Sequence, residues 1–103
     1  MSTVLVCGSR GFSSHQVMLD ALMDHADGFD SVVTGSGPGA DEVCRELCQW
    51  MGIVPTMLNK AAVCIPPGVT LVLAFWDGQS PGTRELIRRA QRAGVTTRIF
   101  YYR

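Results

Sequence analysis

A chain of 103 residues with 47% apolar and 17% charged residues can form one domain around a single core, and this composition excludes intrinsic disorder. The formal net charge is zero, which argues against nucleic acid as a partner. The sequence has no apolar run near the roughly 20 residues that cross a bilayer and no secretory leader, so it predicts a cytoplasmic globular protein without a membrane partner.

The N-terminal third predicts a strand, a helix and a second strand. Residues 3–7 are continuously apolar and β-branched, as in a strand that is buried on both faces. Ser13 and Gln16 fit a capping box at the start of the helix, and Gly28 fits its end. Residues 30–34 predict the second strand. This order of elements is typical of parallel neighbours in an α/β sheet.

The second predicted helix begins near Ala40 and has a clear amphipathic pattern. Its apolar face consists of residues at helical spacing, namely Val43, Cys44, Leu47, Cys48 and Met51. Gly52 predicts the end of this helix. Residues 53–57 predict a third strand at an edge of the sheet, because Pro55 cannot donate a ladder hydrogen bond.

The C-terminal half predicts two more strands with a helix between them. Residues 69–75 give the strongest strand pattern of the chain, and residues 95–102 predict the last strand. Between them, Ser80 fits a helix cap and Pro81 the first helical position. This strand–helix–strand unit predicts another parallel pair.

The whole pattern predicts one α/β domain over residues 1–103. Right-handed crossovers place helices on both faces of a mostly parallel five-stranded sheet, which gives a three-layer, Rossmann-like architecture with the order 3-2-1-4-5. Ligands bind such sheets beyond the carboxyl ends of the strands, where the strand order reverses. A chain this short leaves its sheet edges poorly covered, and this predicts a homo-oligomer.

Three glycine-bearing loops, at residues 8–11, 35–39 and 77–83, follow the carboxyl ends of predicted strands. Backbone amides at a helix N-terminus bind anions, and the guanidinium of Arg10 matches phosphate oxygens. The loops therefore predict a site for a phosphate-bearing small molecule. The candidate ligand-binding residues are Gly8, Ser9, Arg10, Gly35, Ser36, Gly37, Gly39, Ala40, Asp41, Asp77, Gly78, Ser80, Gly82, Thr83 and Arg84.

Details of the second and third loops narrow this prediction. Residues 35–39 lack both the Lys-Ser/Thr ending of a Walker loop and the Gly-x-Gly-x-x-Gly spacing of dinucleotide-binding folds. Asp41 follows in the first helical turn, where it can cap the helix or bind ribose hydroxyls. Gly82 lies in the first turn of a helix at a cost of about 1 kcal/mol relative to alanine, which a bound phosphate would explain. The plainer alternative is that all three loops are ordinary turns.

The cysteines and the C-terminal charges bear on metals and partners. The four cysteines are Cys7, Cys44, Cys48 and Cys64; without a CxxC pair or a nearby histidine they predict reduced core thiols, and neither a metal site nor a cofactor is predicted. Residues 1–80 carry three basic and eight acidic groups, whereas residues 81–103 carry six basic groups and one acidic group. We interpret the stripe of Arg84, Arg88 and Arg92 as a solvated helix face, although the asymmetry also fits an anion-facing side.

The segments VLVCGSRGF, VVTGSGPGADE and LAFWDGQSPGTRELI resemble the signature segments of the SLOG superfamily, in particular its YspA/cpYpsA-like branch. The resemblance covers nearly the whole chain in the same motif order. It implies a Rossmann-like domain that binds a nucleotide or nucleotide-derived ligand as a sensing or sequestering module. Residue by residue, it points to Gly8, Ser9, Arg10, Gly35, Gly39, Ala40, Asp41, Gly82 and Thr83.

One departure from the related Lonely Guy phosphoribohydrolases concerns catalysis. Their Pro-Gly-Gly-x-Gly-Thr-x-x-Glu motif supplies a glutamate for N-glycosidic bond cleavage, but Leu86 occupies that position here and Glu85 lies one residue early, about 100° around a helix. Nucleotide hydrolysis stays an alternative function, with Asp41, Asp77 and Glu85 as candidate acids or bases. Nucleic-acid binding by analogy with DprA, and a purely structural role, are the other two hypotheses.

Overall fold

The computed structural model describes residues 3–25, 29–58 and 65–102, so the predicted helix end at Gly28 and the thiol of Cys64 lie outside the described residues. In chain order, the elements are β1 (Thr3–Gly8), α1 (His15–His25), β2 (Ser31–Thr34), α2 (Ala40–Met51), β3 (Thr56–Met57), β4 (Val69–Trp76), α3 (Pro81–Arg92) and β5 (Thr96–Tyr101). They match the predicted order of strands and helices. β3 is a short, exposed edge strand, as Pro55 predicts.

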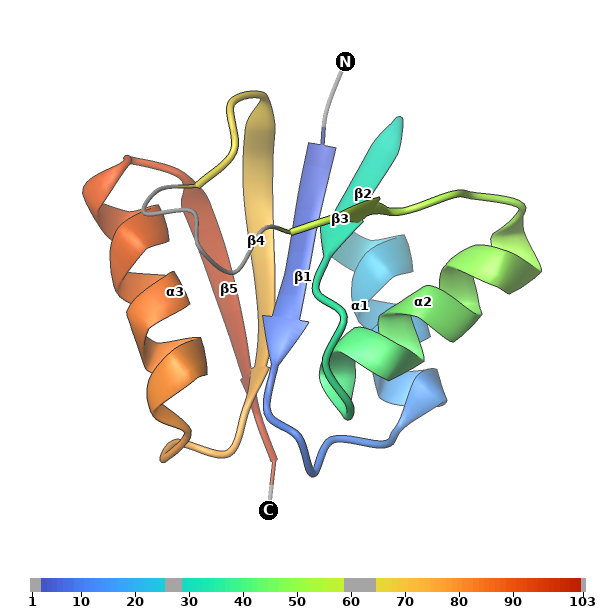
Figure 1. Ribbon diagram of the computed structural model, residues 1–103, viewed down its shortest axis with the longest axis horizontal. Coiled ribbons are helices and arrows are strands. Elements are labelled where there is room, and N and C mark those ends of the chain that lie inside the picture. The colour runs from blue at the N-terminus through green and yellow to red at the C-terminus, as the bar shows by residue number, and fades with distance from the viewer. Residues whose placement is uncertain (1–2, 26–28, 59–64, 103) are drawn as a thin grey trace.

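The five strands form one sheet in the order β3-β2-β1-β4-β5, with every neighbouring pair parallel. This confirms the predicted α/β architecture and strand order. Helices α1 and α2 lie on one face of the sheet and α3 lies on the other (Figure 1). Because the order reverses at the central strand β1, the carboxyl ends of β1 and β4 diverge into loops that run to opposite faces.

Two apolar cores lie on the two faces of the sheet, and β1 contributes to both. Val4 and Val6 belong to the core beneath α1 and α2, whereas Leu5 and Cys7 belong to the core beneath α3. All four side chains are buried. Because successive side chains of a strand alternate between faces, a strand covered on both sides must be apolar throughout. This is why the continuous apolar run predicts a central strand correctly.

The start of α1 differs from the sequence prediction. The hydroxyl of Ser14 accepts the backbone N–H of Val17 at 3.2 Å, so Ser14 is the cap and the predicted capping box of Ser13 is wrong. The side chain of Gln16 donates instead to the Asp20 carboxylate at 2.8 Å. Two adjacent serines offer two possible caps, and local spacing alone does not choose between them.

Loop one (residues 9–14) and the N-terminus of α2 are in direct contact. Gly39, the residue before α2, has φ of 75°, and a Cβ there would overlap the carbonyl oxygens of both Ser9 and Arg10. At Gly8, a Cβ would lie 2.6 Å from the Cβ of Ala40 and would overlap the carbonyl oxygen of Phe75. These two glycines therefore allow the ends of β1 and β4 and the start of α2 to approach one another closely.

We expect Gly39→Ala to destabilise the fold far more than Gly52→Ala. Both glycines have φ near 75°, but a Cβ on Gly52 has nothing within 4 Å, so its replacement carries only the backbone cost of about 1–2 kcal/mol. At Gly39 the overlap with two carbonyls adds about 1–3 kcal/mol. Urea unfolding of both variants measures the difference. Equal losses of stability would show that the close approach of loop one to α2 is not a constraint on the fold.

Candidate functional site

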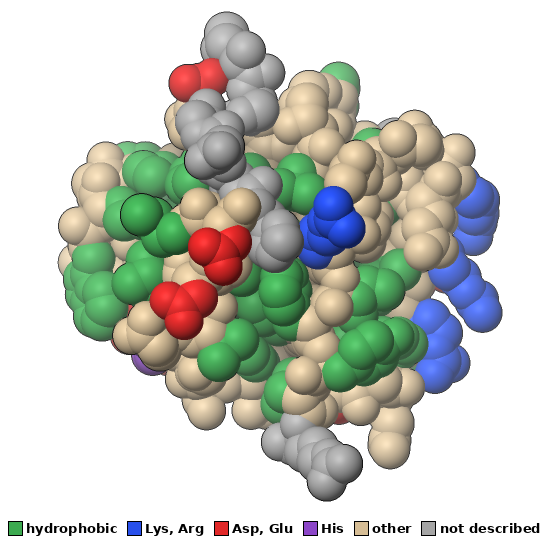
Figure 2. Space-filling model, turned by 180° about the vertical axis from the view of Figure 1, so that it is seen from behind, with side chains coloured by type: hydrophobic (Ala, Val, Ile, Leu, Met, Phe, Trp, Pro, Cys, Tyr) green, Lys and Arg blue, Asp and Glu red, His purple; other side chains and the backbone are tan. Residues whose placement is uncertain are grey.

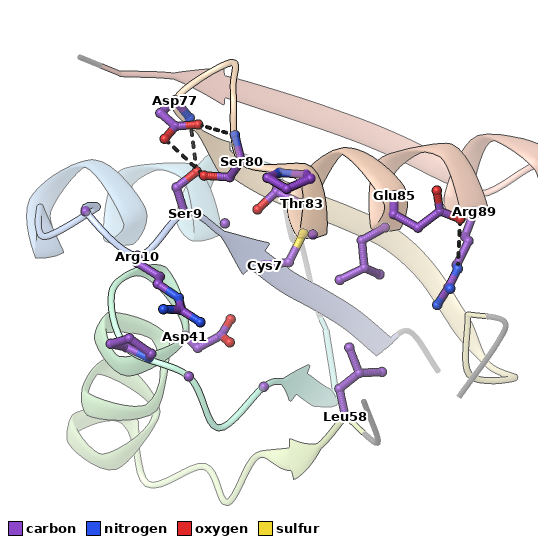
Figure 3. Close-up of a pocket in the computed structure, with 18 residues that line it drawn as sticks. Cys7, Ser9, Arg10, Asp41, Leu58, Asp77, Ser80, Thr83, Glu85 and Arg89 are labelled. Atoms are coloured by element: carbon purple, nitrogen blue, oxygen red, sulfur yellow. Dashed lines mark hydrogen bonds and ion pairs between the residues drawn. The ribbon is translucent and has the colours of Figure 1, made fainter. Parts of the chain in front are cut away.

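A pocket with a volume of about 690 Å³ lies at the carboxyl ends of the central strands, where the strand order reverses (Figure 3). Loop one, loop two (residues 35–39), the first turns of α3 and the end of β3 surround it. Its volume is in the range of small-molecule sites. The lining residues that the sequence predicted are Gly8, Ser9, Arg10, Gly35, Gly37, Asp41, Asp77, Ser80, Gly82, Thr83 and the catalytic candidate Glu85.

The other predicted site residues lie outside the pocket lining. Gly39 and Ala40 hold loop one against α2, and Ser36 is exposed at the tip of its loop. Gly78 lies in the turn before α3, with open space around it. The guanidinium of Arg84 lies 5.6 Å from the centroid of the Trp76 ring. Proximity in the sequence therefore places these residues near the pocket but does not direct them into it.

Ser9 joins three of the segments that form the pocket. Its N–H donates to the carbonyl of Phe75 at 2.9 Å, and its carbonyl accepts the N–H of Ala40 and of Phe12, each at 3.2 Å. Its hydroxyl accepts the N–H of Asp77 at 3.1 Å. The residue is 2% exposed and its polar groups are satisfied within the protein. Ser9 therefore supports the pocket, and its hydroxyl is not free for a ligand as the sequence suggested.

Asp77 organises the turn that leads into α3. Its Oδ1 accepts the N–H of Gln79 at 2.9 Å. The same oxygen accepts the N–H of Ser80 at 2.8 Å, and Oδ2 accepts the Ser80 hydroxyl at 3.0 Å (Figure 3). These hydrogen bonds, led by that from the Ser80 backbone, lower the pKa of Asp77 from 3.8 to about 2. Ser80 is the N-cap residue of α3 and Pro81 its first residue, as predicted, but the hydroxyl of Ser80 donates to Asp77 and makes no capping hydrogen bond to the helix.

The carboxylate of Asp41 lies beside the backbone of loop two. Burial raises the pKa of its carboxyl, while the backbone N–H groups of Gly37 and Gly35 and the charge of Arg45 act in the opposite direction. Arg45 fixes the same loop from the other side, since its Nη1 donates to the carbonyls of Gly35 at 2.7 Å and Gly37 at 3.0 Å. The carboxylate of Asp41 thus lies beside the backbone of loop two, where the sequence predicted a ligand anion, and Gly39 is the N-cap residue of α2.

The N-terminus of α3 is the part of the pocket that suits an anion. Its first turn contains no acidic residue, and the nearest carboxylate before it, that of Asp77, is bonded to the N-cap residue Ser80. A Cβ on Gly82 would meet nothing within 4 Å, and the buried Thr83 follows it. Arg10 lies across the pocket on loop one (Figure 3). An anion here would be close to bare backbone, a hydroxyl and a guanidinium.

The opposite end of the pocket combines an ion pair with apolar side chains. The Oε1 of Glu85 lies 3.3 Å from the Nε of Arg89 and 3.8 Å from a guanidinium nitrogen of Arg92. Leu58 and Leu86 provide the apolar lining. Glu85 lines the pocket despite its one-residue offset, because the pocket extends along α3 and both neighbouring positions border it. Its carboxylate is directed toward Arg89 (Figure 3).

Sequence reasoning missed Cys7, Arg45 and Arg89 as parts of the site. Cys7 lies in the pocket lining, and its pKa is raised to about 12, mainly by burial and secondarily by the charge of Asp41, so the thiol stays protonated. Arg45 follows Asp41 by four residues, a spacing that predicts a shared helix face. Among the described residues, Cys7, Cys44 and Cys48 are free thiols, and no cluster of metal-ligating side chains occurs.

Comparison with known proteins assigns the chain to a family. The Gene 61 protein of Mycobacterium phage D29 is 30% identical over 117 aligned positions, which cover 92% of this chain and 93% of the phage protein. The chain belongs to the family of this phage protein. No family model and no solved structure matches the chain. In the part of the chain that the structure describes, every helix is too short or too polar to traverse a bilayer.

We expect Asp77→Asn to lower the thermal midpoint at pH 7 but not at pH 2. The pKa of Asp77 is lower in the folded protein than its ordinary value of 3.8, so the ionised carboxylate stabilises the fold above about pH 4 and loses this effect as the pH falls toward 2. Thermal unfolding from pH 7 to pH 2 measures the gap between variant and parent. Asp24→Asn, at an exposed position of α1, is the control. If the difference in thermal midpoint between Asp77→Asn and the parent persists at pH 2, the ionised Asp77 carboxylate is not what stabilises the fold.

Proposed function

We propose that this protein binds a nucleotide or a nucleotide-derived phosphorylated small molecule in the pocket, as a sensing or sequestering module. The observation that carries the proposal is the N-terminus of α3, where Gly82, with open space at its Cβ position, lines the same pocket as Arg10. A helix N-terminus with bare backbone and a guanidinium in the same pocket form a favourable environment for phosphate oxygens. The resemblance of the three loops to the SLOG superfamily supports the same ligand class.

The remaining lining suits the rest of a nucleotide. Leu58 and Leu86 offer apolar contacts to a base, and the Glu85–Arg89 pair offers an acceptor and donors to its polar edge. The carboxylate of Asp41 is fixed by the amides of loop two, and it can accept hydrogen bonds from ribose hydroxyls. A phosphate at one end, hydroxyl acceptors in the middle and an apolar wall at the other end are the features that nucleotide recognition requires.

Binding without turnover is favoured over phosphoribohydrolase activity. Asp77 is committed to the turn before α3, Asp41 is bonded to loop two, and Glu85 is paired with Arg89. A general acid or base needs a carboxyl group that can exchange a proton with the substrate, and the partners of these groups within the protein compete with that exchange. The apolar Leu86 also stands at the position where the Lonely Guy enzymes carry their glutamate.

We therefore expect no base release when the protein is incubated with AMP, GMP, CMP or UMP. Chromatography of the reaction mixtures after several hours measures free base against a protein-free control. Base release by the parent that is absent from Glu85→Gln would contradict the proposal and would favour hydrolysis. Glu85→Gln is a suitable comparison because it keeps the size of the side chain while removing its carboxylate.

A pair of substitutions at Gly82 tests the phosphate position directly. Gly82→Ala should raise the free energy of unfolding by about 0.5–1 kcal/mol, since Gly82 is exposed within a helix and its Cβ has open space. Gly82→Asp should be at least as stable as the parent, because an acidic residue near a helix N-terminus adds about 0.3–1 kcal/mol to the free energy of unfolding. The aspartate would nevertheless repel phosphate, so only this variant should lose ligand binding.

Thermal shifts with nucleoside monophosphates, ADP-ribose and cyclic dinucleotides measure this effect. A ligand at 100 times its Kd adds about 2.7 kcal/mol, which raises the midpoint of a domain of this size by about 10–20 °C. The parent and Gly82→Ala should show the shift, whereas Gly82→Asp should not. The proposal is contradicted if no compound shifts the parent, or if Gly82→Asp retains the full shift.

A further inference from the structure

Arg84, Trp76 and Tyr101 form a stack of side chains on the surface outside the pocket. The guanidinium carbon of Arg84 lies 5.6 Å from the centroid of the Trp76 ring, and the Trp76 and Tyr101 ring centroids are 5.7 Å apart. The indole N–H of Trp76 donates to the carbonyl of Ser80 at 3.1 Å, which fixes the central ring. Tyr101 is 68% exposed. An exposed guanidinium and an exposed aromatic ring thus both adjoin the same indole.

The exposed face of α3 continues the positive charge of this stack. Arg88 follows Arg84 by one helical turn, about 6 Å along the axis, and both side chains are exposed. Glu85 pairs with Arg89 and Arg92, and within the described part of the chain neither Arg84 nor Arg88 forms an ion pair. Figure 2 shows several basic side chains along the edge of the molecule where α3 lies, and another nearer the middle of this face.

We propose that the outer face of α3, together with Tyr101 of β5, binds single-stranded nucleic acid. Arg84 and Arg88 would contact successive phosphates, and the exposed ring of Tyr101 would stack on a base. Proteins that bind single strands without sequence preference combine a basic track with aromatic rings in this way. A duplex keeps its bases stacked inside and would leave the ring of Tyr101 without a partner.

This surface is separate from the pocket and does not depend on the proposed function. Arg84, Arg88 and Tyr101 do not line the pocket. The contacts of Trp76 could not be seen in the linear sequence, because Trp76 of β4 meets Arg84 of α3 and Tyr101 of β5 only in the folded protein. The zero net charge of the chain also conceals the concentration of basic groups on α3.

Fluorescence anisotropy with a labelled 20-nucleotide oligothymidylate, measured from 50 to 200 mM salt, tests the proposal. We expect saturable binding by the parent that weakens with salt. The variant Arg84→Ala/Arg88→Ala should bind more weakly, and the slope of log K against log salt should fall by about 1.4, or about 0.7 for each phosphate that an arginine no longer neutralises. Tyr101→Ala should weaken binding about tenfold at every salt concentration while the slope is unchanged.

Arg98→Ala is the matched control. Arg98 is also exposed on β5, but strand alternation places it on the sheet face opposite Tyr101, so its loss should leave both affinity and salt slope nearly unchanged. Thermal midpoints confirm that all variants fold. The proposal is overturned if the parent does not bind at 50 mM salt, if Arg98→Ala weakens binding as much as the double variant, or if a duplex of the same length binds more tightly.

One competing occupant of the surface is a second copy of this chain, whose acidic residues lie mostly outside α3. Light scattering of the parent and of Arg84→Ala/Arg88→Ala distinguishes this case. Self-association that the double substitution abolishes, in the absence of oligonucleotide binding, would overturn the nucleic-acid proposal in favour of a contact between copies. A monomeric parent that binds the oligonucleotide supports it.

Discussion

The hydrogen bonds of one buried serine determine the shape of the candidate site. Ser9 follows the central strand and bonds through its backbone to β4 and α2, and through its hydroxyl to the loop before α3. These partners come from both sides of the point where the strand order reverses. The two glycines at 8 and 39 allow this contact, because a Cβ at either position would overlap a neighbouring carbonyl oxygen. The pocket is therefore preorganised by the fold rather than assembled by a ligand.

Several other polar groups around the pocket are also held by contacts within the protein. Asp77 and Asp41 each accept backbone N–H groups of their own loops, so these two carboxylates maintain loop conformation. Arg45 completes the support of loop two. The N-terminus of α3 and the side chain of Arg10 line one part of the cavity and favour negative oxygens there. Asp41, Asp77 and Glu85 line it as well, so the cavity combines a place for an anion with carboxylates that can accept hydrogen bonds from hydroxyl groups.

The architecture could be predicted from the sequence because it depends on simple patterns. The continuous apolar run of β1 shows burial on both faces, and alternating strands and helices determine parallel pairing and strand order. The gathering of three glycine loops at one edge follows from that order. The sequence does not predict which backbone amides are accessible to a ligand, because this depends on the direction of individual side chains such as the carboxylate of Asp41. Likewise, the stacking of Trp76 with Arg84 and Tyr101 joins residues from three separate elements.

The most direct measurement of the central claim is a titration of ¹⁵N-labelled protein with AMP, followed by amide chemical shifts and compared with inorganic phosphate. The account predicts saturable shifts at Gly82 and Thr83 with both compounds, and additional shifts near Leu86 with AMP alone. The amides of Gly35 and Gly37 should respond less, because the carboxylate of Asp41 lies beside them and repels an anion. An absence of saturable shifts at the start of α3, or saturable shifts confined to another surface, would contradict the account.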